Sequence, residues 1–331
     1  MSPEPQLQAT EPCWVITDGT AGMENQALGL AERLGMPVAV KRVELRWPWN
    51  RLASHLPIAP FKLVSPGSDK VNSPWPRVAI GCGRQSIPFM RAIRKASGGH
   101  TLTVQCQHPR VNPAIFNLVI PPEHDGLVGP NVLPLLGSPN RISPASLEKA
   151  RAHFAPRFEK MRAPRIAVLL GGKNKAYRFG TDEARALAQS LADLAKTSGL
   201  MITASRRTGT ENVAIIRKAL EGSDAILWDG EGENPYLGLL AWADAFIVTA
   251  DSVNMACEAA ATGKPVHIYP LPGGSAKFRQ FHESLARRGI ARPFTGKIEN
   301  WSYEKLDETG RAARAILKLL DLSAAAPDIR G

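Results

Sequence analysis

Two short polar segments in the second half of the chain carry groups that suit phosphate. Gly171 and Gly172 end an apolar run and are followed by Lys173, Asn174 and Lys175. A glycine turn presents backbone N–H groups, and a neighbouring ammonium group adds positive charge, so this segment is suited to phosphate contact. The spacing is not that of a P-loop, and we therefore expect no hydrolysis of a nucleoside triphosphate.

The second segment follows another apolar run and places two adjacent arginines between hydroxyl groups. Its residues are Ser205, Arg206, Arg207 and Thr208. Adjacent guanidinium groups can bind a diphosphate or a carboxylate. Exposed arginines are also common at the ends of strands, and that plainer interpretation stays open beside the first.

A third polar segment, Asp251 to Met255, lies between the apolar run AFIVTA and a helix-like stretch that contains Glu258. A carboxylate on the first or second turn of a helix can accept hydrogen bonds from the two hydroxyl groups of a ribose, and we predict that role for Glu258. For Asp251, capping of the helix is the favoured interpretation.

The loop with Glu233, Asn234 and Pro235 also precedes a helix-like run. Pro235 at the first helical position with Asn234 as the cap is one interpretation. Contact between this loop and a nucleotide base is the weaker alternative, and it keeps Asn234 among the candidate binding residues.

In the first half of the chain, Asp18, Gly19 and Gly22 lie between a strand-like run and a helix-like run. A glycine turn there brings N–H groups close to an anion or a sugar, but a tight turn with Asp18 or Asn25 as helix cap explains the same residues. Asp18 is the first candidate for a catalytic general base. The pair His124 and Asp125 is the second, because a histidine titrates near neutral pH.

The elements that must position these groups follow from the apolar pattern. β-Branched apolar runs alternate with segments of helical period, which predicts parallel α/β architecture. Strand-like runs cover 13–18, 37–45, 77–83, 101–107, 116–122, 165–172, 199–209, 224–230, 245–250 and 266–272. Helix-like runs cover 25–35, a stretch from 84, 181–198, 210–221, a stretch from 252, 276–289 and 303–321.

We predict two doubly wound, Rossmann-like domains facing a cleft. The expected order along the chain is a disordered lead-in, a first domain, a linker helix, a second domain and a tail, over 1–12, 13–150, 151–164, 165–321 and 322–331. The candidate residues fall at the carboxyl ends of the expected strands, where open parallel sheets bind ligands.

The formal charge of +11 over 331 residues suits an anionic partner. Phosphorylated small molecules and anionic membranes fit this charge better than nucleic acid, because the chain lacks a nucleic-acid-binding motif; basic charge for solubility alone is the other explanation. The segments 47–52 and 61–62 suit a membrane interface or the packing of a loop. Cys13, Cys82, Cys106 and Cys257 have no metal-ligand spacing and are expected as reduced core residues.

The stretch 241–272, with the later 277–292, resembles the donor-domain end of GT-B glycosyltransferases. The resemblance implies that the second domain, 165–321, binds the nucleotide-sugar and that the first, 13–150, is the acceptor domain. The resemblance implies that Ser252, Asn254 and Met255 line a nucleotide-sugar loop and that Glu258 holds the ribose. It also implies that TGKPV, residues 262–266, leads into the next strand.

More closely, the chain resembles the family named for plant mitochondrial fission, whose bacterial members are often labelled nucleoside-diphosphate-sugar epimerases. The matching pieces are DGTAGMENQALGLAERLG, FNLVIPPEHD, GPNVLPLLGSPNRIS, SRRT, GENPY and TADSVNM, followed by EA and TGKPV. Asn117 replaces a usual Asp and Asn254 a usual Ser, which leaves the identity of the sugar open.

The expected activity is therefore a metal-independent transfer of sugar from a nucleotide-sugar donor to a cell-envelope glycolipid or saccharide. No Asp-x-Asp pattern is present for a metal, and no NAD-binding pattern is present, so we expect no cofactor. A non-hydrolysing nucleotide-sugar epimerase and a non-catalytic fission-type adaptor are the alternatives. The expected location is cytoplasmic, with peripheral attachment to the inner face of the membrane as an option.

Overall fold

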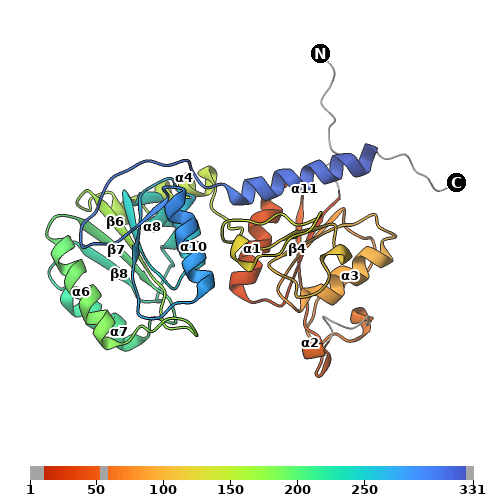
Figure 1. The fold of residues 1–331 in the computed structure, drawn as a ribbon, viewed down its shortest axis with the longest axis horizontal. Helices are drawn as coiled ribbons and strands as arrows, with labels where there is room; N and C mark the ends of the chain where they lie inside the picture. The colour runs from red at the N-terminus through yellow and green to blue at the C-terminus, as the bar shows by residue number, and fades with distance from the viewer. Residues whose placement is uncertain (1–10, 53–58, 326–331) are drawn as a thin grey trace, which may run out of the picture. The chain divides into compact units, whose positions relative to one another are not determined.

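The computed structural model describes residues 11–52 and 59–325 and divides the chain into two compact units (Figure 1). The first unit comprises Met1–Arg141 and Asp307–Gly331, and the second comprises Ile142–Leu306. Residues 1–10 of the predicted lead-in and residues 326–331 of the predicted tail lie outside the described residues.

The first unit contains a parallel sheet of order β2-β1-β3-β4-β5. Both faces of β1 are buried: Cys13 and Val15 face one core cluster, and Trp14 and Ile16 face another. The strands are β1 (Cys13–Thr17), β2 (Val38–Arg42), β3 (Val78–Cys82), β4 (Leu102–Cys106) and β5 (Leu118–Ile120).

Helices cover both faces of this sheet. α1 and α11 pack in the cluster that contains Cys13, and α3 packs in the cluster that contains Trp14. The helices are α1 (Ala21–Glu32), α2 (Trp49–Leu52), α3 (Ser86–Ala96) and α11 (Glu308–Ala325), with the 3-10 turns η1 (Pro60–Lys62), η2 (Pro113–Ile115) and η3 (Glu123–Asp125).

The second unit contains a parallel sheet of order β11-β10-β9-β6-β7-β8. Its strands are β6 (Arg165–Leu170), β7 (Gly199–Ala204), β8 (Ala225–Trp228), β9 (Ala245–Thr249), β10 (Val266–Tyr269) and β11 (Ala291–Pro293). Its helices are α4 (Pro144–His153), α5 (Ala155–Phe158), α6 (Thr181–Ala195), α7 (Thr210–Ala219), α8 (Tyr236–Trp242), α9 (Val253–Ala260) and α10 (Ala276–Arg287).

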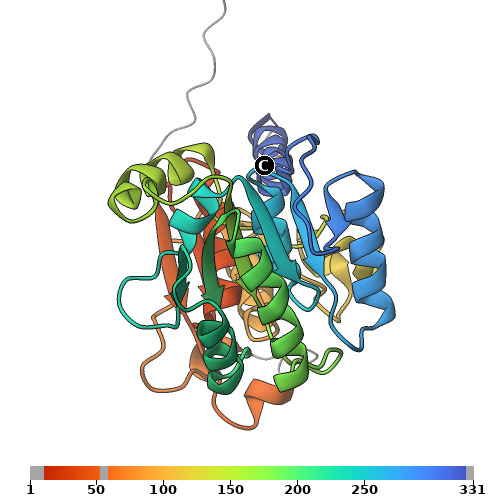
Figure 2. The same cartoon turned by 90° about the vertical axis from the view of Figure 1, so that its left-hand side faces the viewer.

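Helices also cover both faces of the second sheet. α6 and α7 share one core cluster with alternate residues of β6 and β7, and both stand in front of the strands in Figure 2. α8 and α9 contact the same sheet through buried residues outside that cluster, so they cover the opposite face. The predicted fold class, two doubly wound α/β units, is confirmed.

The division of the chain differs from the predicted domains at the C-terminal end. The helix predicted at 303–321 is α11, and it belongs to the first unit rather than to the second. Ala312, Ile316 and Leu320 are buried in the first unit's core, so the apolar face of α11 determines where the helix packs.

The segment 151–164, predicted as a linker helix between the domains, also differs from the prediction. α4 and α5 cover part of this range and belong to the second unit. Phe154 and Phe158 are buried, and a Cβ on Gly238 of α8 would lie 2.5 Å from the Phe154 ring. Close packing on α8 therefore makes this segment part of the second unit's core.

The cysteine prediction is confirmed, because Cys13, Cys82, Cys106 and Cys257 are all buried free thiols. Burial raises the pKa of the Cys13 thiol to about 12, with a smaller contribution from Cys106. A thiol with such a pKa stays protonated at neutral pH and is a poor nucleophile.

Each sheet has one position where the strand order reverses. In the first unit the chain moves outward from β1 to β2 and then returns to β3, and in the second it moves from β6 to β8 and returns to β9. The carboxyl ends at such reversals, β1 with β3 and β6 with β9, are the expected ligand-binding edges.

The two glycines of α1 give a matched test of its packing. A Cβ on Gly29 would lie 2.3 Å from the carbonyl oxygen of Asn140, whereas a Cβ on Gly22 meets nothing within 4 Å. We expect Gly29→Ala to lower the free energy of unfolding by about 1–3 kcal/mol, because the helix must move away. Gly22→Ala should change it by less than about 1 kcal/mol, in the stabilising direction. Urea unfolding measures both, and equal effects would contradict the packing of α1 against residue 140.

Candidate functional site

The carboxylate of Asp251 joins three loops at the strand reversal of the second sheet. It follows β9, and its side chain has no exposed surface. It accepts hydrogen bonds from the Gly172 N–H at 2.9 Å and from Thr249 Oγ1 at 2.7 Å, and it pairs with the Arg207 guanidinium at 2.8 Å. The loops after β6, β7 and β9 are therefore fixed to one another by a single buried charge.

This geometry corrects the interpretation of Asp251 as a helix cap. The N-cap position of α9 is held by Ser252, and its side chain makes no capping hydrogen bond. Asp251 has its oxygens turned toward the loops after β6 and β7 instead. The sequence could not show this, because the partners lie 44 and 79 positions away along the chain.

Gly171 and Gly172 serve the approach of these loops rather than the predicted phosphate contact. A Cβ on Gly171 would lie 2.3 Å from Asp251 Oδ1, and one on Gly172 would lie 2.1 Å from the Arg207 carbonyl oxygen. Their N–H groups donate to Thr249 Oγ1, at 2.8 Å, and to Asp251. Both N–H groups that the sequence suggested for phosphate thus already donate hydrogen bonds to oxygens of the protein.

The hydroxyl groups of Ser205 and Thr208 have a similar structural role. Both donate to the carbonyl oxygen of Gly171, Ser205 at 2.7 Å, and Thr208 is buried. Asn174 closes the neighbouring turn, since its Oδ1 accepts the N–H groups of Ala176 and Tyr177 at 2.7 and 2.9 Å. These three predicted ligand-binding groups are engaged within the protein.

The cationic side chains of the same loops surround a pocket of about 1040 Å³. The pocket lies between the segments 173–181 and 206–212, which lead from β6 and β7 into α6 and α7. Glu211 is the single acidic residue of its lining, and the basic residues are Lys173, Lys175, Arg178, Arg206 and Arg207. Arg207 is paired with Asp251, while in the described part of the chain the other four form no ion pair.

The pocket is therefore strongly basic and suits a polyanion. The first residues of α6 and α7, Thr181 and Thr210, also line it, and helix N-termini favour negative charge. The predicted residues Lys173, Asn174, Arg206, Arg207 and Thr208 all lie at this one pocket. Lys175, which the sequence also suggested for phosphate contact, lies at the pocket as well. Arg178 was not predicted, although the sequence KNKAYR already showed a cation at every second or third position.

Glu258 is held by a residue that the sequence did not single out. The hydroxyl group of Tyr236, at the start of α8, donates to Glu258 Oε2 on α9. Burial raises the pKa of the Glu258 carboxyl to about 7, and the Tyr236 hydrogen bond opposes part of that rise. Burial, then the charge of Glu258, raises the pKa of Tyr236 well above its usual value. The Glu258 carboxyl group of this pair therefore changes its protonation state near neutral pH.

The residues around this pair have distinct positions. Asn234 Oδ1 accepts the Tyr236 N–H at 3.0 Å and so supports the start of α8. The N-cap position is held by Pro235, one residue later than predicted. On α9 the side chain of Asn254 is exposed and that of Met255 is partly exposed. His282 on α10, also not predicted, lies within 2.8 Å of the Ala250 carbonyl oxygen through its Nε2 and so supports the loop after β9.

The candidate bases of the first unit lie apart from each other. Asp18 and Gly19 follow β1, and Asp18 Oδ1 accepts the Thr20 N–H at 3.0 Å, so Asp18 forms the turn into α1. His124 and Asp125 form η3 after β5. Because β3 and β4 separate β1 from β5, the two candidates are roughly 14 Å apart across the sheet and do not form one catalytic group.

Gly19 in that turn and Gly22 in α1 differ in how strictly the structure requires glycine. Gly19 has a φ of 81°, a conformation that favours glycine, and its N–H donates to Thr17 Oγ1 at 3.1 Å. Gly22 lies in α1 with open space where a Cβ would stand. The turn therefore requires Gly19, while nothing in the packing requires Gly22.

The fold is shared with a solved structure. The UDP-GlcNAc 2-epimerase from Methanocaldococcus jannaschii is similar with a TM-score of 0.54 at 12% identity, over 94% of this chain and 99% of that one. The chain belongs to the mitochondrial fission ELM1 family, whose model matches residues 21–320. The predicted family membership is thereby confirmed.

Two relatives illustrate the span of the match. The mitochondrial fission protein ELM1 of Arabidopsis thaliana is 34% identical over 273 residues, which is 74% of this chain but 64% of the plant protein. An uncharacterized protein of Rickettsia prowazekii is 30% identical over 353 aligned positions, covering 92% of this chain and 97% of its own length.

Asp251→Asn tests the contact that joins the three loops. The amide keeps the shape but loses the charge that pairs with Arg207, and we expect the free energy of unfolding to fall by about 1–3 kcal/mol. Asp229→Asn is the control, since its carboxylate pairs with Arg217 at the surface and should contribute little. Urea unfolding compares the two, and an Asp251 variant as stable as the Asp229 variant would contradict the role of Asp251.

The raised pKa of Glu258 predicts a pH dependence of stability. Between about pH 4.5 and 7 the folded protein retains a proton on this carboxyl that the unfolded chain releases. This proton stabilises the folded state, and the contribution is lost as the pH rises through about 7. The free energy of unfolding should fall by up to roughly 3 kcal/mol between acid and alkaline pH, and Glu258→Gln should remove that part of the fall. An unchanged slope in the variant would contradict the burial of Glu258.

Proposed function

We propose that this protein binds a nucleotide-sugar through its second unit and transfers the sugar to an acceptor without a metal ion. The observation that carries the proposal is the basic pocket beside the strand reversal of the second sheet, lined by the predicted Lys173, Arg206 and Arg207. Metal-independent transfer requires protein cations to stabilise the charge of the leaving diphosphate, and this pocket supplies them.

The diphosphate would lie between the loops after β6 and β7. The ammonium of Lys173 and the guanidinium of Arg206 are exposed and without ion pairs among the described residues, so both are available to phosphate oxygens. Arg207 is oriented by the buried Asp251, which holds it in place before the ligand arrives. The N-termini of α6 and α7 add further stabilisation of negative charge.

Glu258 would accept the ribose hydroxyl groups, in line with its place on the second turn of α9. Tyr236 donates to one carboxylate oxygen, Oε2, which leaves Oε1 and the remaining lone pairs for the sugar. A nucleotide that requires the ionised carboxylate should bind more tightly as the pH rises through about 7.

The first unit would bind the acceptor and provide the general base. Asp18 is the first candidate, because it is partly exposed on a glycine turn at the carboxyl edge of the sheet, next to the strand reversal. His124 with Asp125 is the second candidate, on η3. A carboxylate or an imidazole can remove the proton of an attacking hydroxyl group.

We propose a lipid-linked or saccharide acceptor of the cell envelope. Trp47 is 77% exposed and has Arg46 and Arg51 as neighbours in the sequence, and an exposed indole among cations suits an anionic membrane surface. In the described part of the chain, no helix is long and apolar enough to cross a membrane. Contact with the membrane would thus be peripheral.

Calorimetry with a panel of UDP-, GDP-, ADP- and CMP-sugars tests the proposal. At least one should bind, and Lys173→Ala and Arg206→Ala should each weaken that binding roughly fivefold to thirtyfold, because each removes a charge-assisted contact. Lys218→Ala on α7 removes the same charge outside the pocket and should leave the affinity unchanged.

The outcomes separate the possible functions. Binding followed by turnover only with an acceptor supports transfer, and turnover without an acceptor would assign epimerisation instead. No binding by any member of the panel would overturn both enzymatic functions and favour a non-catalytic adaptor.

A further inference from the structure

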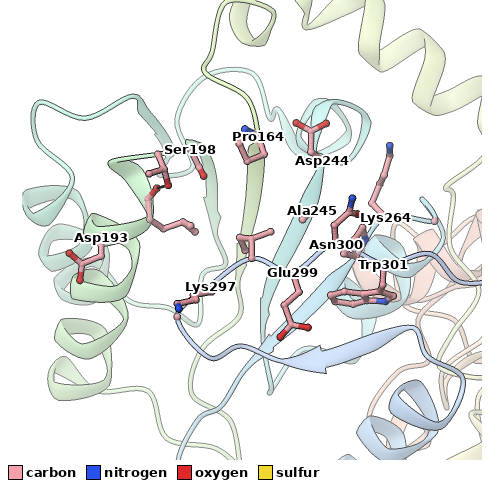
Figure 3. Close-up of a pocket in the computed structure, with 16 residues that line it drawn as sticks. Pro164, Asp193, Ser198, Asp244, Ala245, Lys264, Lys297, Glu299, Asn300 and Trp301 are labelled. Carbon is pink, nitrogen blue, oxygen red and sulfur yellow. Dashed lines mark hydrogen bonds between the residues drawn. The ribbon is translucent and has the colours of Figure 1, made fainter.

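A second cavity lies in the second unit, at the opposite edge of the sheet from the basic pocket. It has a volume of about 720 Å³ and is lined where β6, β9 and β10 begin, by Pro164, Ala245 and Pro265 (Figure 3). Because all six strands are parallel, these amino ends are separated from the carboxyl edge by the length of the strands. The volume is in the range of cavities that bind small molecules.

One wall of this cavity is an irregular segment, residues 296–301, that buried groups hold in place. His267, 1% exposed, accepts the Glu299 N–H at Nε2 (3.1 Å), and its Nδ1 lies 3.1 Å from the Phe246 carbonyl oxygen. These two contacts require a neutral ring with its proton on Nδ1. Trp301 packs edge-on against the same ring and donates its Nε1–H to the Gly289 carbonyl oxygen at 2.9 Å. The wall is therefore preformed.

The acidic groups of the lining are already engaged. Asp193 pairs with Lys196 at 2.7 Å, and Asp244 accepts the Arg165 N–H at 2.7 Å. Glu299 pairs with Arg292, whose guanidinium also lies over the Trp301 ring. Asp193 and Glu299 are thus neutralised by cations of the protein, whereas Asp244 is held by a backbone N–H and keeps its negative charge.

The basic groups of the lining are not engaged. Within residues 11–52 and 59–325 the ammonium groups of Lys264 and Lys297 have no ion pair or side-chain hydrogen bond. Figure 3 shows the two lysines on different sides of the cavity, Lys264 near Asn300 and Trp301 and Lys297 across from them. The unbalanced charge of this cavity is thus positive, although its carboxylates outnumber its lysines.

Apolar side chains form one part of the lining. Leu194, Ile298 and Trp301 belong to this part together with the two prolines and Ala245. An apolar surface of this kind buries the body of a ligand, and a flat ring can lie against the indole. The polar groups at its margin, Ser198 and Asn300, offer hydrogen bonds to a carboxylate or phosphate.

From this combination we propose that the cavity at the amino ends of β6, β9 and β10 binds a small organic anion that has a flat apolar body and one carboxylate or phosphate group. Lys264, which lies beside Asn300 and Trp301, binds the anionic group, Lys297 adds positive charge from the other side of the cavity, and Ile298 and Trp301 contact the apolar body. The TGKPV segment, which the nucleotide-sugar site does not use, has its Lys264 and Pro265 in this role. The site is independent of the basic pocket at the carboxyl edge.

Calorimetry on the full chain with three probes tests this site. The probes are 2-naphthoate, 2-naphthyl phosphate and the uncharged 2-naphthamide. We expect one or both anions to bind with one-to-one stoichiometry and the amide to bind at least tenfold more weakly. The anion that binds more tightly identifies the anionic group.

Matched variants locate the binding. The double variant Lys264→Ala/Lys297→Ala should weaken anion binding at least tenfold, because it removes the charge-assisted contact of Lys264 and the favourable charge of Lys297. Lys149→Ala/Lys218→Ala removes two exposed lysines of the same unit outside both cavities and should have no effect. Lys173→Ala should also have no effect, which distinguishes this site from the nucleotide-sugar pocket. Equal affinity for amide and anions, equal affinity in the two double variants, or no anion binding at millimolar concentration would overturn the proposal.

Discussion

The buried carboxylate of Asp251 is the constraint on which the second unit's carboxyl edge depends. A charge removed from water is tolerated only with compensating partners, and the Gly172 N–H, the Thr249 hydroxyl and the Arg207 guanidinium supply them. The same contacts require glycine at 171 and 172, because a side chain there would displace the carboxylate or the loop after β7. A rigid edge follows, on which Lys173 and Arg206 extend into the basic pocket from fixed loops. Preorganised cations of this kind bind an anion without first having to be ordered.

Much of the fold could be predicted from the sequence because it depends on local patterns. Runs such as RIAVLL and AFIVT are buried on both faces, which is typical of central strands of a parallel sheet, and they form β6 and β9. The destination of α11 could not be predicted in this way. Its amphipathic pattern specifies a helix with one apolar face, but the choice of core depends on which unit has a matching surface, and here Ala312 and Ile316 fit beside α1.

The candidate site shows the same limit more sharply. Strand ends identified the right loops, and Lys173, Arg206 and Arg207 do line one pocket. The roles of individual groups often differ from the predicted ones, because they depend on partners distant in sequence. Ser205 and Thr208 donate hydrogen bonds to the Gly171 carbonyl oxygen, and Asp251 accepts one from the Gly172 N–H. Tyr236 was missed for the same reason, since only the fold brings the start of α8 to Glu258. Residue type therefore predicted where chemistry could occur better than which atom would perform it.

We propose that a nucleotide-sugar binds at the carboxyl edge of the second sheet, over the loops that Asp251 joins. Hydrogen–deuterium exchange of the full chain, with and without a UDP-sugar at saturating concentration, tests the place of binding directly. We expect slower exchange in 173–181 and 206–212, and around Tyr236 and Glu258, with no change at the amino ends of β6 and β9. Unchanged exchange in those loops, or protection confined to other segments, would contradict it.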